Sequence, residues 1–433
     1  MKKINILYDA TMLTQGFLNG PARAGLFFTA YNLLKQFAAD FRFHVILYLS
    51  EMSDYRHFME YMKNDGFFSQ FSVIANYKQP NVYKYNIGVH KKNISLTNNI
   101  FKKIYYYLKI IKNYLYQFLF YKNADSNYET IKTIDAYFSP LNAVPPEIAE
   151  IGNIKQFLVL HDVIPNIYPE YYHDLSSDHW YIKMINSLNK KHYCFCNSES
   201  TRNDFLSYFG RQLDERKLFV THISSSQQLR PDYDDVKLTR TLKKYNVMYD
   251  SKKKYIFSFC TLEPRKNLIF TIRCFFKFIE RHNIDDLYFF LGGGHWDRFI
   301  GQLKEQINNF NIYSKKIVQL GYIDDEDVNV LYSNSLFFAY ISQYEGFGMP
   351  PLEAMQAGTP VITSNNSSLP EVVGDAAITI TYNDEEACIK AFEDFYFNEA
   401  LRKEYIAKGL ERAKLFSWEK TYIKISDIII NVI

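Results

Sequence analysis

The chain has 433 residues, of which 47% are hydrophobic and 22% charged, and its formal net charge is +3 at pH 7. This length exceeds one ordinary core, so we expect two domains of about 200 residues each. The hydrophobic content excludes a disordered chain, and no run of eighteen apolar residues indicates a transmembrane helix.

The N-terminus and the cysteines favour a cytoplasmic protein. The opening MKKINILYDATML reaches Asp9 after an apolar stretch too short for the hydrophobic region of a signal peptide. The cysteines are odd in number, lack the spacing of a metal site, and are expected to be reduced: Cys194, Cys196, Cys260, Cys274 and Cys388.

In the first half of the chain, apolar strands alternate with helical stretches. A strand opens the chain, a glycine-bearing loop follows at 14–25 and a helix at 26–37. Further strands are expected at 43–50, 134–140, 155–162 and 192–198, and a helix at 199–210. This alternation predicts a parallel, doubly wound sheet.

The pattern lapses near 224–253 and then resumes. Strands are expected at 255–263, 287–294, 316–323, 335–342 and 359–364, and a last helix at 416–430. The fold class is therefore α/β with two Rossmann-like halves in series. We predict an N-terminal domain at 1–228, a linker at 229–252, a C-terminal domain at 253–415, and a helix at 416–433 that packs back toward the first domain.

A basic, aromatic insertion spans residues 66–124, which hold nine lysines and no acidic residue. Within it, apolar residues recur at spacings of three and four, the pattern of a helical stripe: Phe101, Ile104, Leu108, Ile111, Leu115 and Phe118. Residues 100–122 suit either an anionic membrane surface or a helix packed on the core with a solvated basic face. No nucleic-acid motif accompanies the lysines.

The stretch EGFGMPPLE holds two glutamates, Glu345 and Glu353, on either side of a glycine-containing loop. It follows a buried strand and leads into a helix, so Glu345 lies beyond the carboxyl end of a strand, where open α/β sheets bind ligands. We expect Glu353 in the first helical turn. A favourable helix-dipole interaction would explain Glu353 alone, but neither Glu345 nor Gly346 and Gly348.

Residues 344–377, YEGFGMPPLEAMQAGTPVITSNNSSLPEVVGDAA, closely resemble the retaining nucleotide-sugar glycosyltransferases of family four (group 1), which have the GT-B fold. The resemblance implies two Rossmann-like doubly wound domains facing a central cleft. It implies that Glu345 contacts the donor sugar and Glu353 the ribose hydroxyls, with Gly346, Phe347 and Gly348 in the donor site.

A second match is TLEPRKNL at 261–268, where the resemblance implies that Lys266 and Arg265 stabilise the leaving diphosphate. Relatives often carry an arginine six residues before the lysine, and Cys260 stands there. A solvated basic helix start is the alternative. The strand and glycine turn ending LYFFLGGG adds Gly292 to the donor site.

The N-terminal half matches more loosely. GPARAG stands where relatives carry a glycine loop whose amides face the diphosphate, so Gly20 and Gly25 are candidates. HDVIP resembles the family's His-Asp stretch and makes His161 a candidate beside the reacting sugar, although a lone histidine is commonly structural. Arg202, in NSESTRND, is a weaker candidate. The acidic run near Asp324 and Asp325 indicates a helix N-cap rather than a metal site.

The function implied is transfer of a hexose, mannose from GDP-mannose first, to a glycan or lipid-linked acceptor in bacterial surface polysaccharide or glycoconjugate synthesis. The resemblance implies no metal and no cofactor, and the nucleotide sugar is a substrate. We expect the protein in the cytoplasm or at the inner face of the plasma membrane. UDP- and dTDP-sugars stay open as donors. Rivals are an epimerase or phosphorylase of this fold, and an inactive glycosyltransferase-like partner protein.

Overall fold

The computed structural model describes residues 3–18, 25–49, 58–59, 61–62, 65–75, 87, 90–91, 93–95, 97, 99–172, 175–177, 179–226, 228–247, 253–294, 297–309 and 314–433. At 15–18, 75, 116–128, 297–300 and 309, the backbone alone is described.

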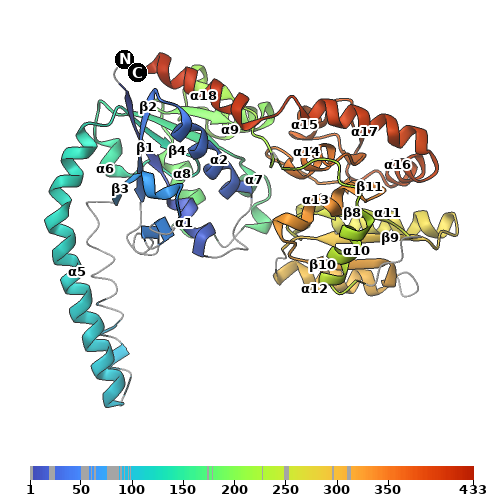
Figure 1. Ribbon diagram of the computed structural model, residues 1–433, viewed down its shortest axis with the longest axis horizontal. Helices are drawn as coiled ribbons and strands as arrows, with labels where there is room; N and C mark the ends of the chain where they lie inside the picture. Colours follow the sequence, from blue (N-terminus) through green and yellow to red (C-terminus); the bar gives the residue numbers. More distant parts are fainter. Residues whose placement is uncertain are drawn as a thin grey trace.

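The first half forms a seven-stranded sheet in the order β3-β2-β1-β4-β5-β6-β7, with all neighbours parallel (Figure 1). Its strands are β1 (Ile4–Asp9), β2 (Phe43–Leu49), β3 (Ser72–Ala75), β4 (Ala136–Ser139), β5 (Lys155–Leu160), β6 (Tyr193–Cys196) and β7 (Leu218–Val220). Its helices are α1 (Thr11–Leu18), α2 (Gly25–Ala39), α5 (Ile100–Lys132), α6 (Pro146–Ala149), α7 (Ile164–Ile167), α8 (Trp180–Ser187) and α9 (Glu199–Phe209).

The second half forms a six-stranded parallel sheet in the order β10-β9-β8-β11-β12-β13. Its strands are β8 (Lys254–Phe259), β9 (Leu287–Gly292), β10 (Ile317–Gly321), β11 (Phe337–Tyr340), β12 (Val361–Ser364) and β13 (Ile378–Ile380). Its helices are α11 (Leu268–Arg281), α12 (Asp297–Asn309), α13 (Asp325–Ser333), α14 (Met349–Gln356), α15 (Leu369–Val373), α16 (Glu385–Phe397) and α17 (Glu399–Ala413).

Both sheets have the doubly wound order, in which the chain starts in the middle, runs to one edge, and returns to build the other. Their central strands are apolar runs because helices cover both faces of the sheet. All four residues of β4 and of β11 are buried. The fold class expected from the sequence is confirmed as two α/β halves.

Two helices connect the halves. The predicted linker contains α10 (Asp235–Lys244), which is held on α13 by an ion pair of 2.6 Å between Lys244 Nζ and Asp327 Oδ2. The last helix, α18 (Trp418–Val432), returns to the first half, where the Tyr422 ring lies edge-on to Phe37 at 4.9 Å. Figure 1 shows α18, in red, above the N-terminal sheet. The predicted domain boundaries themselves stay a prediction.

Three local expectations were wrong or incomplete. The loop expected at 14–25 begins inside α1, which runs from Thr11 to Leu18. The short strands β3, β7 and β13 were not expected, because three or four residues carry little periodic signal. Glu353 is the fifth residue of α14, beyond its first turn.

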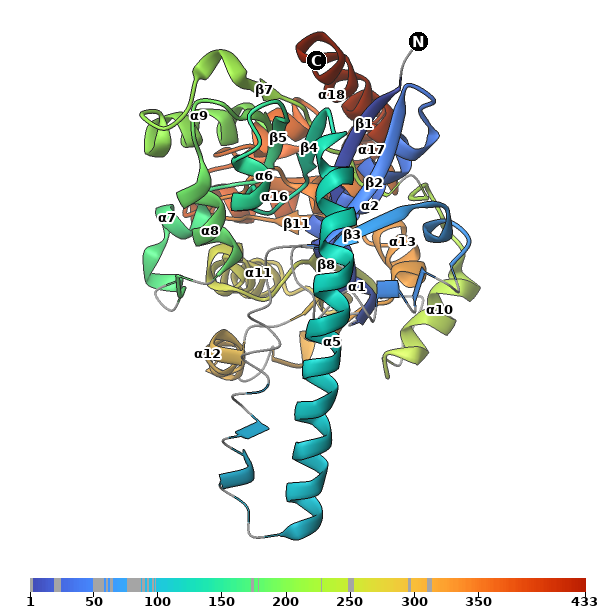
Figure 2. The same cartoon turned by 90° about the vertical axis from the view of Figure 1, so that its left-hand side faces the viewer.

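Helix α5 stands apart from the rest of the fold. It has 33 residues, about 50 Å at 1.5 Å per residue, and both views show its N-terminal part extending away from the sheets (Figures 1 and 2). Among the described residues, no helix is both long and apolar enough to cross a membrane.

Candidate active site

The candidate site lies where two neighbouring strands of the second sheet end. Strands β8 and β11 pair in parallel, so their carboxyl ends share one edge. Lys266 closes a short 3-10 helix, Pro264–Lys266, soon after β8, and Glu345 lies in the loop between β11 and α14. Sheet topology therefore brings together residues 79 positions apart in the chain.

Glu345 is buried and ion-paired on both carboxylate oxygens. Its Oε1 accepts hydrogen bonds from Lys266 Nζ at 2.7 Å and from the Tyr340 hydroxyl at 2.9 Å. Its Oε2 lies 2.9 Å from Nη1 of Arg265. Lys266 Nζ also donates to the Tyr340 hydroxyl at 2.6 Å. One carboxylate thus holds two cations at a strand edge.

Arg265 is tied to its surroundings on several sides. Its Nη2 donates to Glu263 Oε1 at 2.6 Å, and its Nη1 donates to the Tyr344 carbonyl at 2.7 Å. Its Nε is buried and has no partner among the described residues. The solvated basic helix start is therefore wrong, since both Arg265 and Lys266 are largely buried.

The charges around Glu345 control its ionisation. Burial alone would raise its pKa, but Arg265 and Lys266 outweigh it and lower the pKa to about 2. Glu345 is therefore ionised at every physiological pH.

Glu353 has the opposite environment. It is half-buried in α14, and its Oε2 accepts a hydrogen bond of 3.0 Å from the Tyr332 hydroxyl. No cation is recorded within ion-pair distance among the described residues. Burial raises its pKa to about 7, against the lowering effect of the Tyr332 hydrogen bond.

Two glycines shape the loop between the glutamates: one adopts a positive φ, and the other lets the loop approach the main chain of the first half closely. Gly348 precedes α14 with φ of 111°, which disfavours other residues. A Cβ on Gly346 would lie 2.4 Å from the His161 carbonyl oxygen of the other half. The ring of Phe347 is buried against His222 and Phe416, so packing accounts for this side chain.

His161 follows β5 at the carboxyl edge of the first sheet, and its main chain lies against Gly346. Its ring is buried, and Nε2 lies 2.7 Å from the Pro140 carbonyl, which makes this nitrogen the donor. Burial lowers the pKa of His161, so the ring is neutral near pH 7. The main chain of His161 thus lies where the two sheets meet, and its ring has a structural partner. That His161 lies beside the reacting sugar stays a prediction.

The remaining predicted glycines differ in their surroundings. Gly25 begins α2, where a Cβ would lie 3.2 Å from Sδ of Met349, so this glycine meets the start of α14 across the two halves. Gly20 lies outside the described residues. Gly292 ends β9, and a Cβ there would lie 2.3 Å from the side chain of Ile323. Packing therefore explains Gly292 without a ligand.

The carboxyl edges of the two sheets meet directly. The Gly346 carbonyl accepts hydrogen bonds from Ser198 Oγ at 2.7 Å and Thr201 Oγ1 at 3.0 Å, both near the start of α9. The Glu371 carboxylate accepts from the backbone N–H groups of Glu199 and Ser200, each at 2.7 Å. A carboxylate at a helix N-terminus is favoured by the helix dipole, so α15 and α9 hold the halves together.

Sequence reasoning missed three residues of this site. Tyr340 contacts both Lys266 and Glu345, Tyr332 contacts Glu353, and Glu263 contacts Arg265. A usable signal existed for Tyr340, because a tyrosine at the end of a buried strand needs a polar partner for its hydroxyl.

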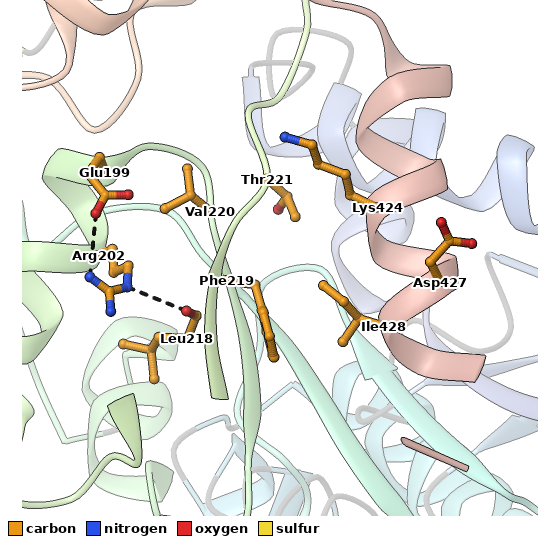
Figure 3. Close-up of a pocket in the computed structure, with 9 residues that line it drawn as sticks. All are labelled: Glu199, Arg202, Leu218, Phe219, Val220, Thr221, Lys424, Asp427 and Ile428. Atoms are coloured by element: carbon orange, nitrogen blue, oxygen red, sulfur yellow. Dashed lines mark hydrogen bonds and ion pairs between the residues drawn. The ribbon is translucent and has the colours of Figure 1, made fainter. Parts of the chain in front are cut away.

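A cavity of about 710 Å³ lies between β7 and α18, and neither Glu345 nor Glu353 lines it (Figure 3). Its lining residues include Arg202, which forms ion pairs with Glu199 at 3.4 Å and Glu215 at 3.0 Å. The guanidinium of Arg202, the weaker site candidate, therefore lies at this cavity and is engaged by two carboxylates.

The acidic run before α13 is also engaged within the chain. Asp324 is the N-cap residue of α13 without a side-chain capping bond, and its Oδ2 pairs with Lys244 at 2.6 Å. In the described part of the chain, no group of three or more His, Cys, Asp or Glu residues is arranged to hold a metal ion.

Comparisons with known proteins cover both halves. The model of the family "Glycosyl transferases group 1" matches residues 242–412. O-antigen chain mannosyltransferase B of Escherichia coli is 31% identical over 260 residues, 60% of this chain and 66% of that protein. Serotype-specific mannosyltransferase WbdA of Escherichia coli is 26% identical over 268 residues, 62% of this chain and 32% of that protein. The chain thus spans just under two thirds of the first relative and about a third of the second.

A crystal structure of HepE from Anabaena, in complex with UDP and glucose, aligns with 99% of this chain and 100% of that chain. The TM-score is 0.66 at 14% identity, a likeness that concerns the fold alone. The family match covers the half that carries Lys266, Glu345 and Glu353. Residues 242–412 therefore match the group 1 glycosyl transferase family, and the two halves together have the GT-B fold.

Proposed function

We propose that this protein transfers a hexose from a nucleoside-diphosphate sugar to a glycan or lipid-linked acceptor, with retention of the anomeric configuration. The observation that carries the proposal is the buried cluster of Glu345, Lys266 and Arg265 at the carboxyl ends of β8 and β11. Ligands of open α/β sheets bind at such an edge.

The cations of the cluster supply what a departing diphosphate needs. Negative charge grows on the diphosphate as the bond to the sugar breaks, and fixed positive charge in a buried site stabilises it. Lys266 and Arg265 are already ordered by Glu345, so little reorganisation accompanies the reaction. The unpartnered Nε of Arg265 adds a further donor at this place.

The two glutamates divide the recognition of the donor. Glu345 is ionised and accepts hydrogen bonds from the sugar hydroxyls, and Glu353 accepts from both ribose hydroxyls. Gly346 and Gly348 allow the chain to approach the donor, and Gly25 meets α14 from the other half. His161, whose carbonyl lies against Gly346, is the proposed catalytic residue beside the reacting sugar.

The chemistry assigns positioning and charge stabilisation to the protein. Of the carboxylates described at the site, Glu345 and Glu263 are ion-paired with Arg265 and Glu353 accepts a hydrogen bond from Tyr332, so none stands out as a nucleophile toward the sugar. Front-face displacement, in which the departing phosphate assists deprotonation of the acceptor, fits this arrangement. The reaction needs no metal or other cofactor.

GDP-mannose is the proposed donor, and a growing surface polysaccharide or its lipid-linked precursor the proposed acceptor. The support is that the relatives matched over 60% and 62% of this chain are named mannosyltransferases, one of them of the O-antigen chain. Such acceptors place the enzyme in the cytoplasm, at the inner face of the membrane. UDP- or dTDP-sugars are the alternative donors.

A thermal-shift panel of GDP, UDP, dTDP and ADP identifies the base. At 100 times its dissociation constant, a nucleotide that binds only the folded protein adds about 2.7 kcal/mol of stability. We expect a shift with GDP that is lost in Glu353→Ala and kept in Glu326→Gln, an exposed glutamate of α13. Proton NMR of the product then reads the anomeric configuration. If none of the four nucleotides raises the melting temperature, an inactive partner protein is favoured. Inversion of the anomeric configuration in the product would refute the retaining mechanism.

A further inference from the structure

Helix α5 exposes the apolar stripe that its sequence carries. Five residues at alternating spacings of three and four have more than half or about half of their surface exposed: Phe101 (78%), Ile104 (50%), Leu108 (61%), Ile111 (62%) and Leu115 (56%). Contiguous exposed apolar side chains of this kind mark interaction sites. The alternative of a stripe packed on the core is therefore wrong for these five residues.

The opposite face of α5 is the one that packs on the chain. Ile110 is 8% exposed, and the Tyr106 ring stacks on His90 at 5.9 Å. Lys103, Tyr106, Ile110 and Asn113 are all partly or fully buried and follow helical spacing. Contacts within the protein thus hold the helix by one side and leave the stripe uncovered.

The flanks of the stripe combine tyrosine and lysine. Tyr105, Tyr107 and Tyr114 are each more than half exposed, and Lys109 lies over the Tyr105 ring at 5.3 Å. On a helix of 3.6 residues per turn, Lys112 falls about 20° from Phe101 at the edge of the stripe, and Lys109 and Lys102 fall about 80° and 100° from Phe101 on the same side. Aromatic rings next to a basic flank are typical of helices that lie in the interface of a bilayer.

The exposed stripe of α5 could be covered by a membrane or by a second copy of the chain, and the charge of the arm favours the membrane. The spacing of the stripe would also suit a coiled coil. However, residues 66–124 contain nine lysines and no acidic residue, so a second copy of this arm would bring lysine to lysine. An anionic lipid surface offers the complementary charge, and it attracts basic residues within a Debye length.

We infer that α5 docks on anionic phospholipid, lying in the membrane interface with Phe101, Ile104, Leu108, Ile111 and Leu115 among the acyl chains. The projection of the helix from both sheets lets it reach a surface before the rest of the fold (Figure 2). The inference extends the proposed function, because a lipid-linked acceptor is held at that surface. It does not depend on the donor.

Vesicle flotation of the full chain tests the inference without nucleotide. The vesicles are phosphatidylcholine alone or with 30% phosphatidylglycerol. We expect binding to the anionic vesicles and a fall of about 100-fold in affinity for Lys102→Glu/Lys109→Glu/Lys112→Glu. The triple variant Ile104→Ser/Leu108→Ser/Ile111→Ser should lose at least 10-fold on both kinds of vesicle.

Control variants carry the same kinds of substitution elsewhere on the surface. Lys190→Glu/Lys243→Glu/Lys304→Glu alters the net charge equally at exposed lysines, and Phe41→Ser/Leu415→Ser removes apolar side chains that are 77% and 57% exposed. Both controls should bind as the wild type does. Circular dichroism and the nucleotide thermal shift report the fold and the donor site of every variant.

Three outcomes would overturn the inference. One is absence of binding to anionic vesicles, and another is an equal loss in the control variants. The third is a dimer in light scattering that dissociates in the serine variant while vesicles bind neither form. A nucleotide shift that persists beside any of these would leave the proposed transferase function standing, so the two failures are separable.

Discussion

Glu345, on a loop, and Glu353, on a helix, are the same residue type only eight positions apart, but their pKa values shift in opposite directions. The loop puts its carboxylate between Lys266 and Arg265, with a pKa of about 2, whereas the helix buries its carboxylate beside one tyrosine, with a pKa of about 7. Burial acts in the same direction on both groups. The difference arises because Arg265 and Lys266, which follow β8, pair with Glu345 and not with Glu353.

The largest expected loss of stability and activity is at Glu345, on the loop between β11 and α14. In Glu345→Gln, the buried Lys266 loses its counter-ion and the buried Arg265 keeps only Glu263, so the free energy of unfolding at pH 7 should fall by about 3–5 kcal/mol. Hexose transfer should fall by a factor of about 100 or more, since the donor site loses its ordered cations. Urea unfolding and the rate of product formation measure the two effects.

The control for this variant is Glu385→Gln. Its carboxylate also meets two cations, Arg273 at 3.1 Å and Lys277 at 2.6 Å, but these side chains are 45% and 47% exposed. Exposed pairs contribute about 0–1 kcal/mol. Equal losses in the two variants would mean that burial of the Glu345 cluster has no special energetic role.

At Glu353 we expect a smaller effect, a change in the affinity for GDP that depends on pH. An ionised carboxylate binds a diol more strongly than a neutral carboxyl, so affinity for GDP should rise about tenfold between pH 6 and pH 8. In Glu353→Gln the affinity should be lower and independent of pH across this range. Calorimetric titration at several pH values measures it, and a parallel rise in the variant would contradict the assignment.

The same two glutamates should affect stability in opposite directions as pH changes. The folded pKa of Glu353 is raised from 4.5 to about 7, so its contribution is greatest below pH 4.5 and is lost as the pH rises to 7. The folded pKa of Glu345 is lowered to about 2, so its contribution is lost as the pH falls from 4.5 to 2. Comparing each Gln variant with the wild type across pH isolates each slope.

The smallest effect is expected where the halves meet. Glu371→Gln keeps one acceptor oxygen for the N–H groups of Glu199 and Ser200 but removes the charge, at a cost of about 1 kcal/mol. Small-angle scattering should then show a larger radius of gyration without nucleotide. Glu404→Gln, in an exposed ion pair with Lys408 on α17, should leave the radius unchanged.

Much of the fold could be predicted from the sequence because buried parallel strands are continuous apolar runs. FFAY and KQFLVL stand out in any reading of the chain, whereas β13, three residues long, does not. The start of α1 was missed because glycines at 16 and 20 favoured a loop. The glycine and proline residues between Glu345 and Glu353 marked the site, since they indicate a strand–loop–helix junction.

Partners across the sheet could not be predicted in the same way. Nothing in the local sequence of Tyr340, Tyr332 or Glu263 says which carboxylate or guanidinium each one meets. For α5 the local sequence predicted a helix and its stripe, but not the side that would pack. The packed side is the one that carries Tyr106, which stacks on His90, and the buried Ile110.

The sequence by itself determined the alternation of strands and helices, the glycine loop and the residue types of the donor site, because hydrophobic periodicity and turn chemistry are local. Only the tertiary structure decided that Glu345 is ion-paired while Glu353 meets no cation among the described residues, that Phe347 and Gly292 serve packing, and that the stripe of α5 is exposed. Charge state and burial depend on neighbours that sheet topology brings from distant parts of the chain.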